Sequence, residues 1–430
     1  MITLLVLLAS SSFAIDKTTT LHSPGTVDSS FGTGGFITIP STEKRAFYAM
    51  GLQSDGKLLA ISGPGDWSVH SLKSKLTRYN SDGSVDLSFG NSGSSVLPFT
   101  PYFDFWHTWL NVIVQSDGKI LVAGTIENDD ARGVPLNYSF VSSRFNYNGS
   151  PDVSYGKNGI VYGDVTANPS FWKLELQKNM KLVALGYFGD DGDILVRYNQ
   201  DGSVDSSFGG NGFLKLKPEV LYPESALAIT IQADGKILVA FDGNKLSERN
   251  VFRYNIDGAV DQSFGTNGKL VVDVFGDSNS YWPGLSADRG TPILLSTQPD
   301  GKILIGGSMD EHSLPGHIAL GRYNANGTID SAFGQNGLVL SSFNPLMGNS
   351  PKSIVEQADG TILVAGDGFG HLGLARFKGN GSPDMNFGTN GVFSYLGLSL
   401  GEDNGVQQTQ IQSDRKILIM NWLAIGKFFQ

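Results

Sequence analysis

The side chains best suited to bind or transform a ligand fall in a few short segments. In one of them, Asp310, Glu311, His312 and His317 place two carboxylates and two imidazoles within eight residues. Such groups serve in proteins as metal ligands and as general acids or bases. A His-x4-His pair in a flexible loop lacks the rigidity and the ligand number of a metal site, so this segment indicates no metal.

Large aromatic side chains gather in similar segments. All six tryptophans and five of the six histidines lie there or at the adjoining strand ends: Trp67, Trp106, Trp109, Trp172, Trp282, Trp422, His70, His107, His312, His317 and His371. Aromatic side chains beside acids stack on sugar rings, and aromatic residues with arginine form hot spots for protein partners. A single tryptophan is more often packed against a core, but the clustering of the whole set favours a binding surface.

Composition and motifs exclude several function classes. The sequence has no Ser-His-Asp phrase, no His-Glu-x-x-His and no phosphate-binding glycine loop. With no cysteine it can form neither a disulfide nor a thiolate metal site, and its net charge of −10 argues against nucleic acid or an anionic membrane as partner. We expect a non-enzymatic protein that binds a glycan or another protein. A hydrolase or lyase is the alternative, and a purely structural envelope scaffold is the third possibility.

A phrase repeated seven times must position these segments. One copy begins Gln232-Ala-Asp-Gly-Lys and continues at Arg253-Tyr-Asn-Ile-Asp-Gly. Its glutamine recurs as Gln53, Gln115, Gln177, Gln232, Gln298, Gln357 and Gln412, and an aromatic residue before a corner glycine recurs as Phe31, Phe89, Tyr155, Phe208, Phe264, Phe333 and Phe387. An Asp-Gly pair between two β-rich runs predicts a hairpin. Each copy predicts four strands, here within 226–231, 236–241, 250–255 and 269–274.

The seventh copy is divided between the two ends of the chain. The segment from Gly25 supplies only a fourth strand, at 36–39, whereas 406–412, 416–420 and 424–429 supply strands one to three. Joining them completes the unit and leaves no exposed sheet edge, as in a closed ring. We therefore predict an all-β fold: a seven-bladed β-propeller of four-stranded antiparallel blades, closed by a 3+1 clasp between the C-terminal strands and the N-terminal strand.

These phrases carry a family resemblance. The Phe-Gly-x-x-Gly and Gln-x-Asp-Gly-Lys pairing resembles the delta-sixty repeat family of exported bacterial proteins over residues 25 to 430, and the strand order is distantly similar to NHL-type propellers. The resemblance implies a propeller-like fold and brings no activity with it. Two hairpins depart from the pattern, at Gln177-Lys-Asn-Met-Lys and Gln412-Ser-Asp-Arg-Lys, and we expect them to be looser or differently turned.

The repeated polar residues allow two interpretations. Alternating oxygen side chains in Asn80-Ser-Asp-Gly-Ser-Val-Asp could hold calcium. The central aspartate of this phrase is Asn148, Asn326 or Asn380 in other copies, which fits an Asx-type turn better. Calcium is thus possible but not favoured, and no other cofactor is expected. The repeated phenylalanine is interpreted as a wedge between neighbouring blades.

Antiparallel strands divide the connections between two faces. The nearly identical Asp-Gly hairpins and glycine corners share one face, and the variable connections share the other, where binding usually lies. Residues eight before each glutamine should ring the mouth of a central channel: Arg45, His107, Pro169, Glu224, Gly290, Asn349 and Asn404. The candidate ligand-binding residues are Arg45, Trp106, His107, Trp109, Trp172, Glu224, Trp282, Asp288, Arg289, Asp310, Glu311, His312, His317 and His371, and no catalytic or metal-binding residue is assigned. The alternative hydrolase or lyase site would lie at the same mouth.

The N-terminus resembles a secretory signal peptide. Residues 1–14 form a short apolar run that ends in Ser-Phe-Ala, without the usual positive charge at its start. The run is too short to span a bilayer. We expect cleavage after Ala14, a single propeller domain over 15–430, and a monomer that is secreted, periplasmic or on the cell surface.

Overall fold

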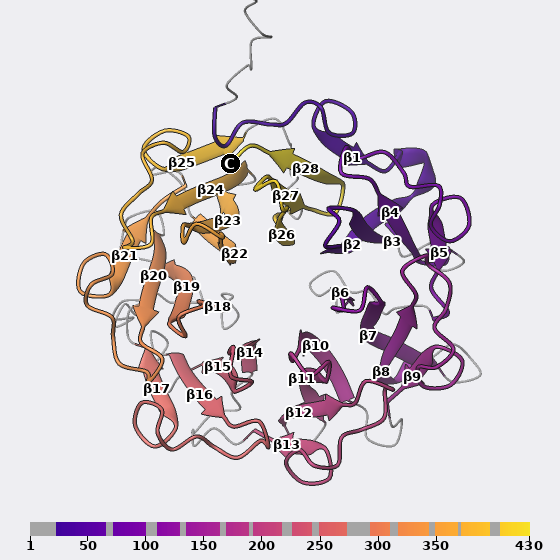
Figure 1. Cartoon of the computed structure of the whole chain (residues 1–430), viewed down its shortest axis with the longest axis horizontal. Coiled ribbons are helices and arrows are strands. Elements are labelled where there is room, and N and C mark those ends of the chain that lie inside the picture. Colours follow the sequence, from indigo (N-terminus) through magenta and orange to yellow (C-terminus); the bar gives the residue numbers. More distant parts are fainter. Residues whose placement is uncertain are drawn as a thin grey trace, which may run out of the picture.

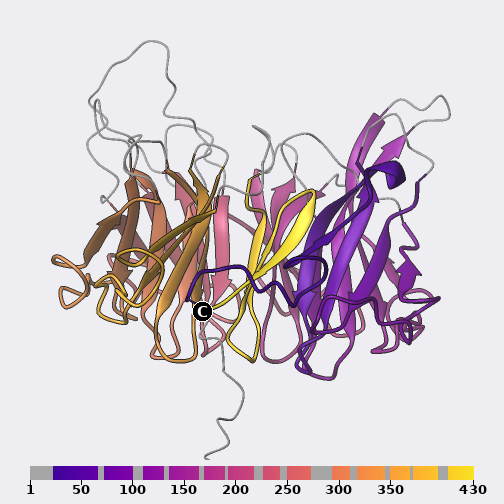
Figure 2. The same cartoon turned by 90° about the horizontal axis from the view of Figure 1, so that it is seen from above.

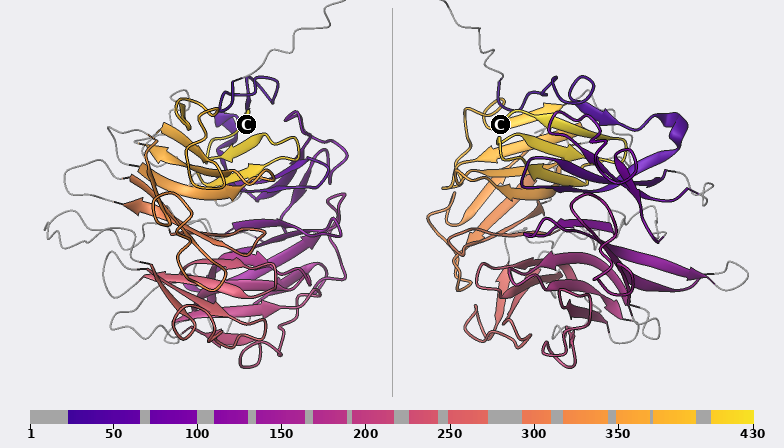
Figure 3. Two further views of the ribbon diagram at one scale, coloured as in Figure 1. Left: turned by 60° about the vertical axis from the view of Figure 1, so that its left-hand side comes forward. Right: turned by 45° about the vertical axis from the view of Figure 1, so that its right-hand side comes forward.

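Seven four-stranded antiparallel sheets surround a common axis (Figure 1). The computed structural model describes residues 23–65, 72–99, 110–129, 135–163, 169–188, 192–216, 226–242, 249–272, 293–309, 317–343, 349–368, 371–395 and 405–430. The predicted fold class, an all-β propeller of seven four-stranded blades, is confirmed. Oblique views show the blades following one another around the ring (Figure 3). Within the described ranges, no helix is long and apolar enough to cross a membrane.

Each blade contributes one strand to the inner wall of the ring. These inner strands are β2 (Arg45–Leu52), β6 (Leu110–Val114), β10 (Pro169–Leu176), β14 (Ala226–Ile231), β18 (Leu294–Thr297), β22 (Asn349–Glu356) and β26 (Gln408–Ile411). The second strands are β3 (Leu58–Pro64), β7 (Ile120–Asp129), β11 (Leu182–Phe188), β15 (Ile237–Asp242), β19 (Ile303–Met309), β23 (Ile362–Gly368) and β27 (Ile417–Met420).

The outer half of each blade is made by two further strands. The third strands are β4 (Lys75–Tyr79), β8 (Pro135–Phe145), β12 (Asp193–Tyr198), β16 (Arg249–Tyr254), β20 (His317–Tyr323), β24 (His371–Phe377) and β28 (Ala424–Phe428). The outermost strands are β5 (Ser94–Val96), β9 (Ile160–Tyr162), β13 (Phe213–Lys215), β17 (Lys269–Val272), β21 (Leu338–Ser341), β25 (Val392–Tyr395) and β1 (Phe36–Thr38). The outermost strands have only three or four residues, which keeps the exposed sheet edges short. A 3-10 turn, η1 (Ser41–Glu43), precedes β2.

One blade joins the two ends of the chain. β1 pairs antiparallel with β28, with Phe36 opposite Gly426 and Thr38 opposite Ala424, and the sheet order is β1-β28-β27-β26. Further along, the amide of Gly25 donates to the carbonyl of Phe429 at 2.7 Å. This sheet has the three-plus-one composition expected from the divided repeat.

The core lies between neighbouring blades. Phe89 is fully buried among residues of its own blade and of the next one, including Ile120 and Phe145. The corner that carries it turns at Gly90 (φ +53), where a Cβ would lie 2.3 Å from the carbonyl oxygen of Ser94. Glycine is therefore required at that corner. The aromatic position of the repeat is the wedge that the sequence predicted.

The two atypical hairpins keep the common turn. Met180 and Arg415 occupy the glycine position with φ values of 67° and 68°. Their amides donate to the carbonyls of Gln177 and Gln412 at 2.8 Å, as Gly56 does to Gln53 at 2.9 Å. The expectation of looser or different turns is therefore wrong. The surrounding strands hold a non-glycine residue in the left-handed region, which costs some backbone strain.

Candidate functional site

The ring has two unlike faces (Figure 2). The turns that join strands one to two and three to four lie on one face, called here the hairpin face. Strands two and four end, and strands one and three begin, at the opposite face, called here the loop face. The antiparallel pairing within every blade fixes this division.

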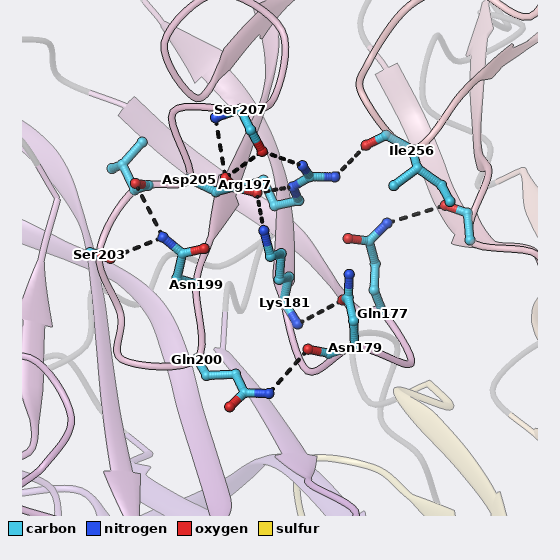
Figure 4. Close-up of polar contacts among 12 residues, drawn as sticks. Gln177, Asn179, Lys181, Arg197, Asn199, Gln200, Ser203, Asp205, Ser207 and Ile256 are labelled. Atoms are coloured by element: carbon cyan, nitrogen blue, oxygen red, sulfur yellow. Dashed lines mark hydrogen bonds and ion pairs between the residues drawn. The ribbon is translucent and has the colours of Figure 1, made fainter.

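A charged network ties neighbouring blades together at the hairpin face (Figure 4). Lys181 Nζ and Arg197 Nε both donate to Oδ2 of buried Asp205, at 2.7 and 2.6 Å. Ser207 Oγ donates to the other carboxylate oxygen at 2.7 Å. The Arg197 guanidinium lies 4.6 Å from the ring centre of Phe208 and donates to the carbonyl of Ile256 in the next blade.

The same network recurs around the ring. Complete copies are Lys57–Asp86–Arg78, Lys119–Asp152–Arg144, Lys181–Asp205–Arg197, Lys236–Asp261–Arg253 and Lys302–Asp330–Arg322. One copy has Thr361 in place of the lysine and keeps Arg376–Asp384, and the clasp copy pairs Asp28 with Lys416 and has Lys427 at the arginine position. The hydrogen bond from Lys57, together with Ser88 and the Arg78 charge, holds the pKa of Asp86 below its usual range. These carboxylates already have charged partners.

The second turn is an Asx turn in the six blades that are made from a continuous stretch of chain. Asp82 Oδ1 accepts the amide of Ser84 at 2.9 Å, and Asn148 Oδ1 accepts the amide of Ser150 at 3.0 Å. Aspartate and asparagine are interchangeable in this role because only one side-chain oxygen is used. Within the described ranges, no group of three histidine, aspartate or glutamate side chains is close enough together to hold a metal ion.

Four candidate residues from the sequence fall within described strands. Trp172 and His317 lie in β10 and β20, Arg45 begins β2, and His371 begins β24. The other candidates lie outside the described residues: Trp106, His107, Trp109, Glu224, Trp282, Asp288, Arg289, Asp310, Glu311 and His312.

Arg45 holds the protein's own chain. Its Nη1 donates to the carbonyl of Lys73 at 3.0 Å, and its side chain is only 7% exposed. Asn349 at the equivalent position accepts the Phe343 amide at 2.7 Å and donates to Ser342 Oγ at 2.9 Å. These contacts revise the interpretation of Arg45 as a ligand contact, because its guanidinium fixes the connections at the loop face.

The two described histidines start third strands. His317 lies opposite Met309 and His371 lies opposite Gly368, at the loop-face ends of β20 and β24. The inner strands stand between these positions and the axis (Figure 1). Trp422, also at the loop face, packs edge-on against Tyr48 with ring centres 5.0 Å apart. That tryptophan caps the core, as is usual for a single large aromatic residue.

The inner strands carry a different side chain in each blade at the same backbone position. Four residues before the repeat glutamine stand Ala49, Asn111, Lys173, Ala228, Leu294, Ser353 and Gln408. Each pairs with the residue eight after its glutamine, so the seven are equivalent in register. Two residues before the glutamine stand Gly51, Ile113, Glu175, Thr230, Ser296, Val355 and Gln410. We call the solvent-accessible members of these two sets, together with Lys352, the axial surface.

The axial surface contains one adjacent acid–base pair. Lys173 is exposed and Glu175 is partly exposed, two residues apart on β10. The surrounding blades remove much of the bulk water around both groups. This desolvation lowers the pKa of Lys173 and raises the pKa of Glu175 to about 7, and the neighbouring opposite charge offsets part of each shift. Sequence reasoning missed both residues, although no other inner strand carries a charge at either position.

Second strands are tethered to the next blade at the loop-face end. Thr125 Oγ1 donates to the carbonyl of Phe171 at 3.2 Å, and Asp367 Oδ1 accepts the amide of Val406 at 2.8 Å. Burial raises the pKa of Asp367 to about 6, which the Val406 amide and the Lys352 charge only partly offset. A carboxyl at this tether makes one contact between blades sensitive to pH.

Comparison with known proteins supports the fold. Six segments match the model described as "Domain of unknown function (DUF5122) beta-propeller": residues 53–89, 115–134, 179–208, 232–264, 298–333 and 357–387. The protein is a β-propeller. Its resemblance to the delta-sixty and NHL families stays a prediction, and no curated protein matches the sequence.

Solved structures resemble the chain only distantly. An ulvan lyase of polysaccharide lyase family PL25 is 12% identical, with a TM-score of 0.40 and 83% of each chain covered. An acylaminoacyl peptidase from Pyrococcus horikoshii is 10% identical, with a TM-score of 0.46, covering 89% of this chain and 50% of that one. A mutant of AofleA from Arthrobotrys oligospora is 12% identical, with a TM-score of 0.38, covering 82% and 86%. We transfer no activity from proteins this distant.

Proposed function

We propose that this propeller is a non-enzymatic binding protein that recognises a glycan or a protein at its loop face, with the axial surface as part of the site. One observation carries the proposal: equivalent backbone positions on the inner strands hold unlike side chains, including Asn111, Lys173 and Gln408. An asymmetric ligand requires such broken symmetry. The hairpin face, by contrast, repeats the same paired charges from blade to blade.

The test is a glycan and envelope-protein binding screen on residues 15–430, followed by variants. Asn111→Ala combined with Gln410→Ala removes two partly exposed amides from the inner strands. We expect at least a tenfold loss of affinity for any ligand found, with the thermal midpoint nearly unchanged. Gln200→Ala with Gln335→Ala is the matched control, because both of these amides are exposed at the hairpin face.

Several results would count against this function. A screen without any ligand argues against a binding role. Equal affinity loss in both double variants, or none in the first, places the interaction away from the axial surface. Export also stays a proposal, and N-terminal sequencing of the protein recovered from its host tests cleavage after Ala14.

The Lys173–Glu175 pair supports a second candidate, a hydrolase or lyase acting near the axis. A carboxyl with a pKa near 7 beside an amine with a lowered pKa suits proton transfer at neutral pH. If this candidate is right, a polysaccharide or peptide substrate is turned over by the wild type and not by Glu175→Gln. No turnover across both substrate classes removes the candidate.

A further inference from the structure

Two lysines lie on the inner strands of different blades. Lys173 lies in β10 and Lys352 in β22, and both side chains are exposed. These inner strands stand on opposite sides of the central opening (Figure 1). In the described part of the chain neither lysine forms an ion pair within 4.0 Å, whereas Lys57, Lys181 and Lys236 each reach a carboxylate at 2.7–2.8 Å.

The inner strands carry two acidic residues besides these two lysines. Besides these lysines and the buried Arg45, the described inner strands carry only Glu175 and Glu356 as charged residues. Glu356 accepts a hydrogen bond from Gln298 at 2.9 Å, and Glu175 has its pKa raised toward neutrality. Asp367, in the adjacent strand β23, accepts the Val406 amide; burial raises the pKa of its carboxyl, and the Lys352 charge lowers it in part. Two ammonium groups without an ion pair in the described part of the chain thus lie at the axial surface, and desolvation lowers the pKa of Lys173.

The neighbouring side chains suit a sugar ring. Asn111, Ser353 and Gln408 stand at the register position of Lys173 in three other blades. Asn111 and Ser353 can bond to hydroxyl groups, whereas Gln408 Oε1 accepts the Met50 amide at 2.6 Å, which leaves its amide nitrogen as a donor. Ala228 and Leu294 occupy the same position in the two blades that follow β10, and both side chains are buried. Cations beside neutral hydrogen-bonding groups suit a sugar that carries an acidic group.

We propose that the axial surface binds a glycan bearing carboxylate or sulfate groups, with Lys173 and Lys352 each contacting an acidic group. This inference rests on the proposed binding function and specifies its ligand class. The lysines provide point charges, which accept either acidic group without a fixed geometry. Asn111, Ser353 and the amide nitrogen of Gln408 contact hydroxyl groups.

Isothermal titration calorimetry on residues 15–430 tests the proposal with four probes. These are hexameric oligogalacturonate, its methyl ester, dextran sulfate and neutral dextran. We expect at least one anionic probe to bind at least tenfold more tightly than its neutral counterpart, with affinity falling as salt is raised. Lys173→Gln with Lys352→Gln should lower that affinity tenfold or more. Lys157→Gln with Lys378→Gln, two exposed lysines of the hairpin face, should leave it unchanged.

The possible failures are distinguishable. If neither anionic probe binds, or the neutral probes bind equally well, the proposed ligand class is wrong. An equal loss in both lysine pairs shows nonspecific attraction and also overturns it. A neutral glycan or a protein that binds in the broader screen and depends on Asn111 and Gln410 would leave the proposed function standing while this inference fails.

Discussion

In five blades a single carboxylate pairs with a lysine and an arginine from two different strands. Asp205 accepts from both Lys181 and Arg197, so Asp205→Ala leaves two cations facing each other at a largely buried site. We expect a loss of about 3 kcal/mol in the free energy of unfolding, the order seen when one partner of a buried ion pair is removed. Chemical denaturation measures it. Asp201→Asn is the control and should change stability by less than about 0.5 kcal/mol, because other blades use asparagine there.

The same carboxylates predict the response to acid. Their pKa values are lowered in the folded state, as for Asp86 and Asp205, so the folded protein binds fewer protons than the unfolded chain near pH 4. Their contribution is complete above the unfolded pKa and is lost as pH falls below it. The thermal midpoint should therefore drop steeply below about pH 4, near the ordinary aspartate pKa. A midpoint that stays constant down to pH 2.5 would contradict this expectation.

Asp367 should behave in the opposite sense. Its raised folded pKa of about 6 means that stability declines as pH rises through the range from about 4 to 6 and stays reduced above it. Asp367→Asn keeps an acceptor for the Val406 amide and removes the ionisation. We expect this variant to be more stable than the wild type at pH 7.5, by at most about 3 kcal/mol, and nearly equal to it at pH 4. Equal midpoint shifts at both pH values would exclude this explanation.

At the scale of the element, one blade has a different residue at the lysine position of the charged network. Thr361 takes the lysine position beside Arg376 and Asp384. Thr361→Lys should restore the ion pair and raise the free energy of unfolding by about 0.5–1 kcal/mol, the range of a partly exposed pair. The lost hydrogen bond from Thr361 Oγ1 to Asp359 limits the gain. Thr361→Met, similar in length and uncharged, is the control, and a gain in it equal to that of the lysine variant would refute the charge argument.

The elements also show what sequence could predict. Aromatic wedges such as Phe89 and the Asp-Gly turns could be predicted because the same local pattern recurs in several copies, and each copy supports the assignment made in the others. The divided blade could be predicted from the strands that each end of the chain supplies. The turn at Met180 was misjudged, because tertiary packing holds a conformation that the local sequence disfavours. The Arg–Asp pairs were missed although an arginine stands eight residues before the repeated aspartate, as in Arg197 and Asp205.

The site was harder to predict than the fold. The spacing of eight residues before the repeat glutamine correctly predicts that Arg45 lies at the start of an inner strand. The spacing does not predict that its guanidinium donates to the carbonyl of Lys73. Lys173 and Lys352 were not identified from the sequence, because the two lysines are far apart in the sequence and come to the same central opening only when the ring closes. The alternation of apolar and polar residues along a strand predicts which side chains are buried within a blade. It does not predict which side chains of different blades lie near each other at the axial surface.

At the scale of the whole molecule, closure depends on a short N-terminal segment. A chain that starts at Ser41 lacks β1, the wedge Phe31 and the Lys416 partner Asp28. Loss of a buried phenylalanine alone costs about 3–5 kcal/mol. We expect this chain to unfold at a much lower temperature and to associate through the free edge of β28, as seen by calorimetry and gel filtration. A synthetic peptide of residues 23–40 should restore part of the stability, and an unchanged midpoint without it would show that the clasp is dispensable.

The clasp also determines which face of the molecule is attached when the protein is immobilised through its C-terminus. Both described ends of the chain, near Gly25 and Phe429, meet at the hairpin face, where strand β28 finishes. A C-terminal tag fixed to a sensor chip or a bead would therefore anchor the ring by that face and leave the strand ends of the loop face toward the solution. Immobilisation by random lysine coupling would instead consume Lys173 and Lys352 in some molecules. The orientation built into the fold thus makes terminal capture the informative format for any binding measurement.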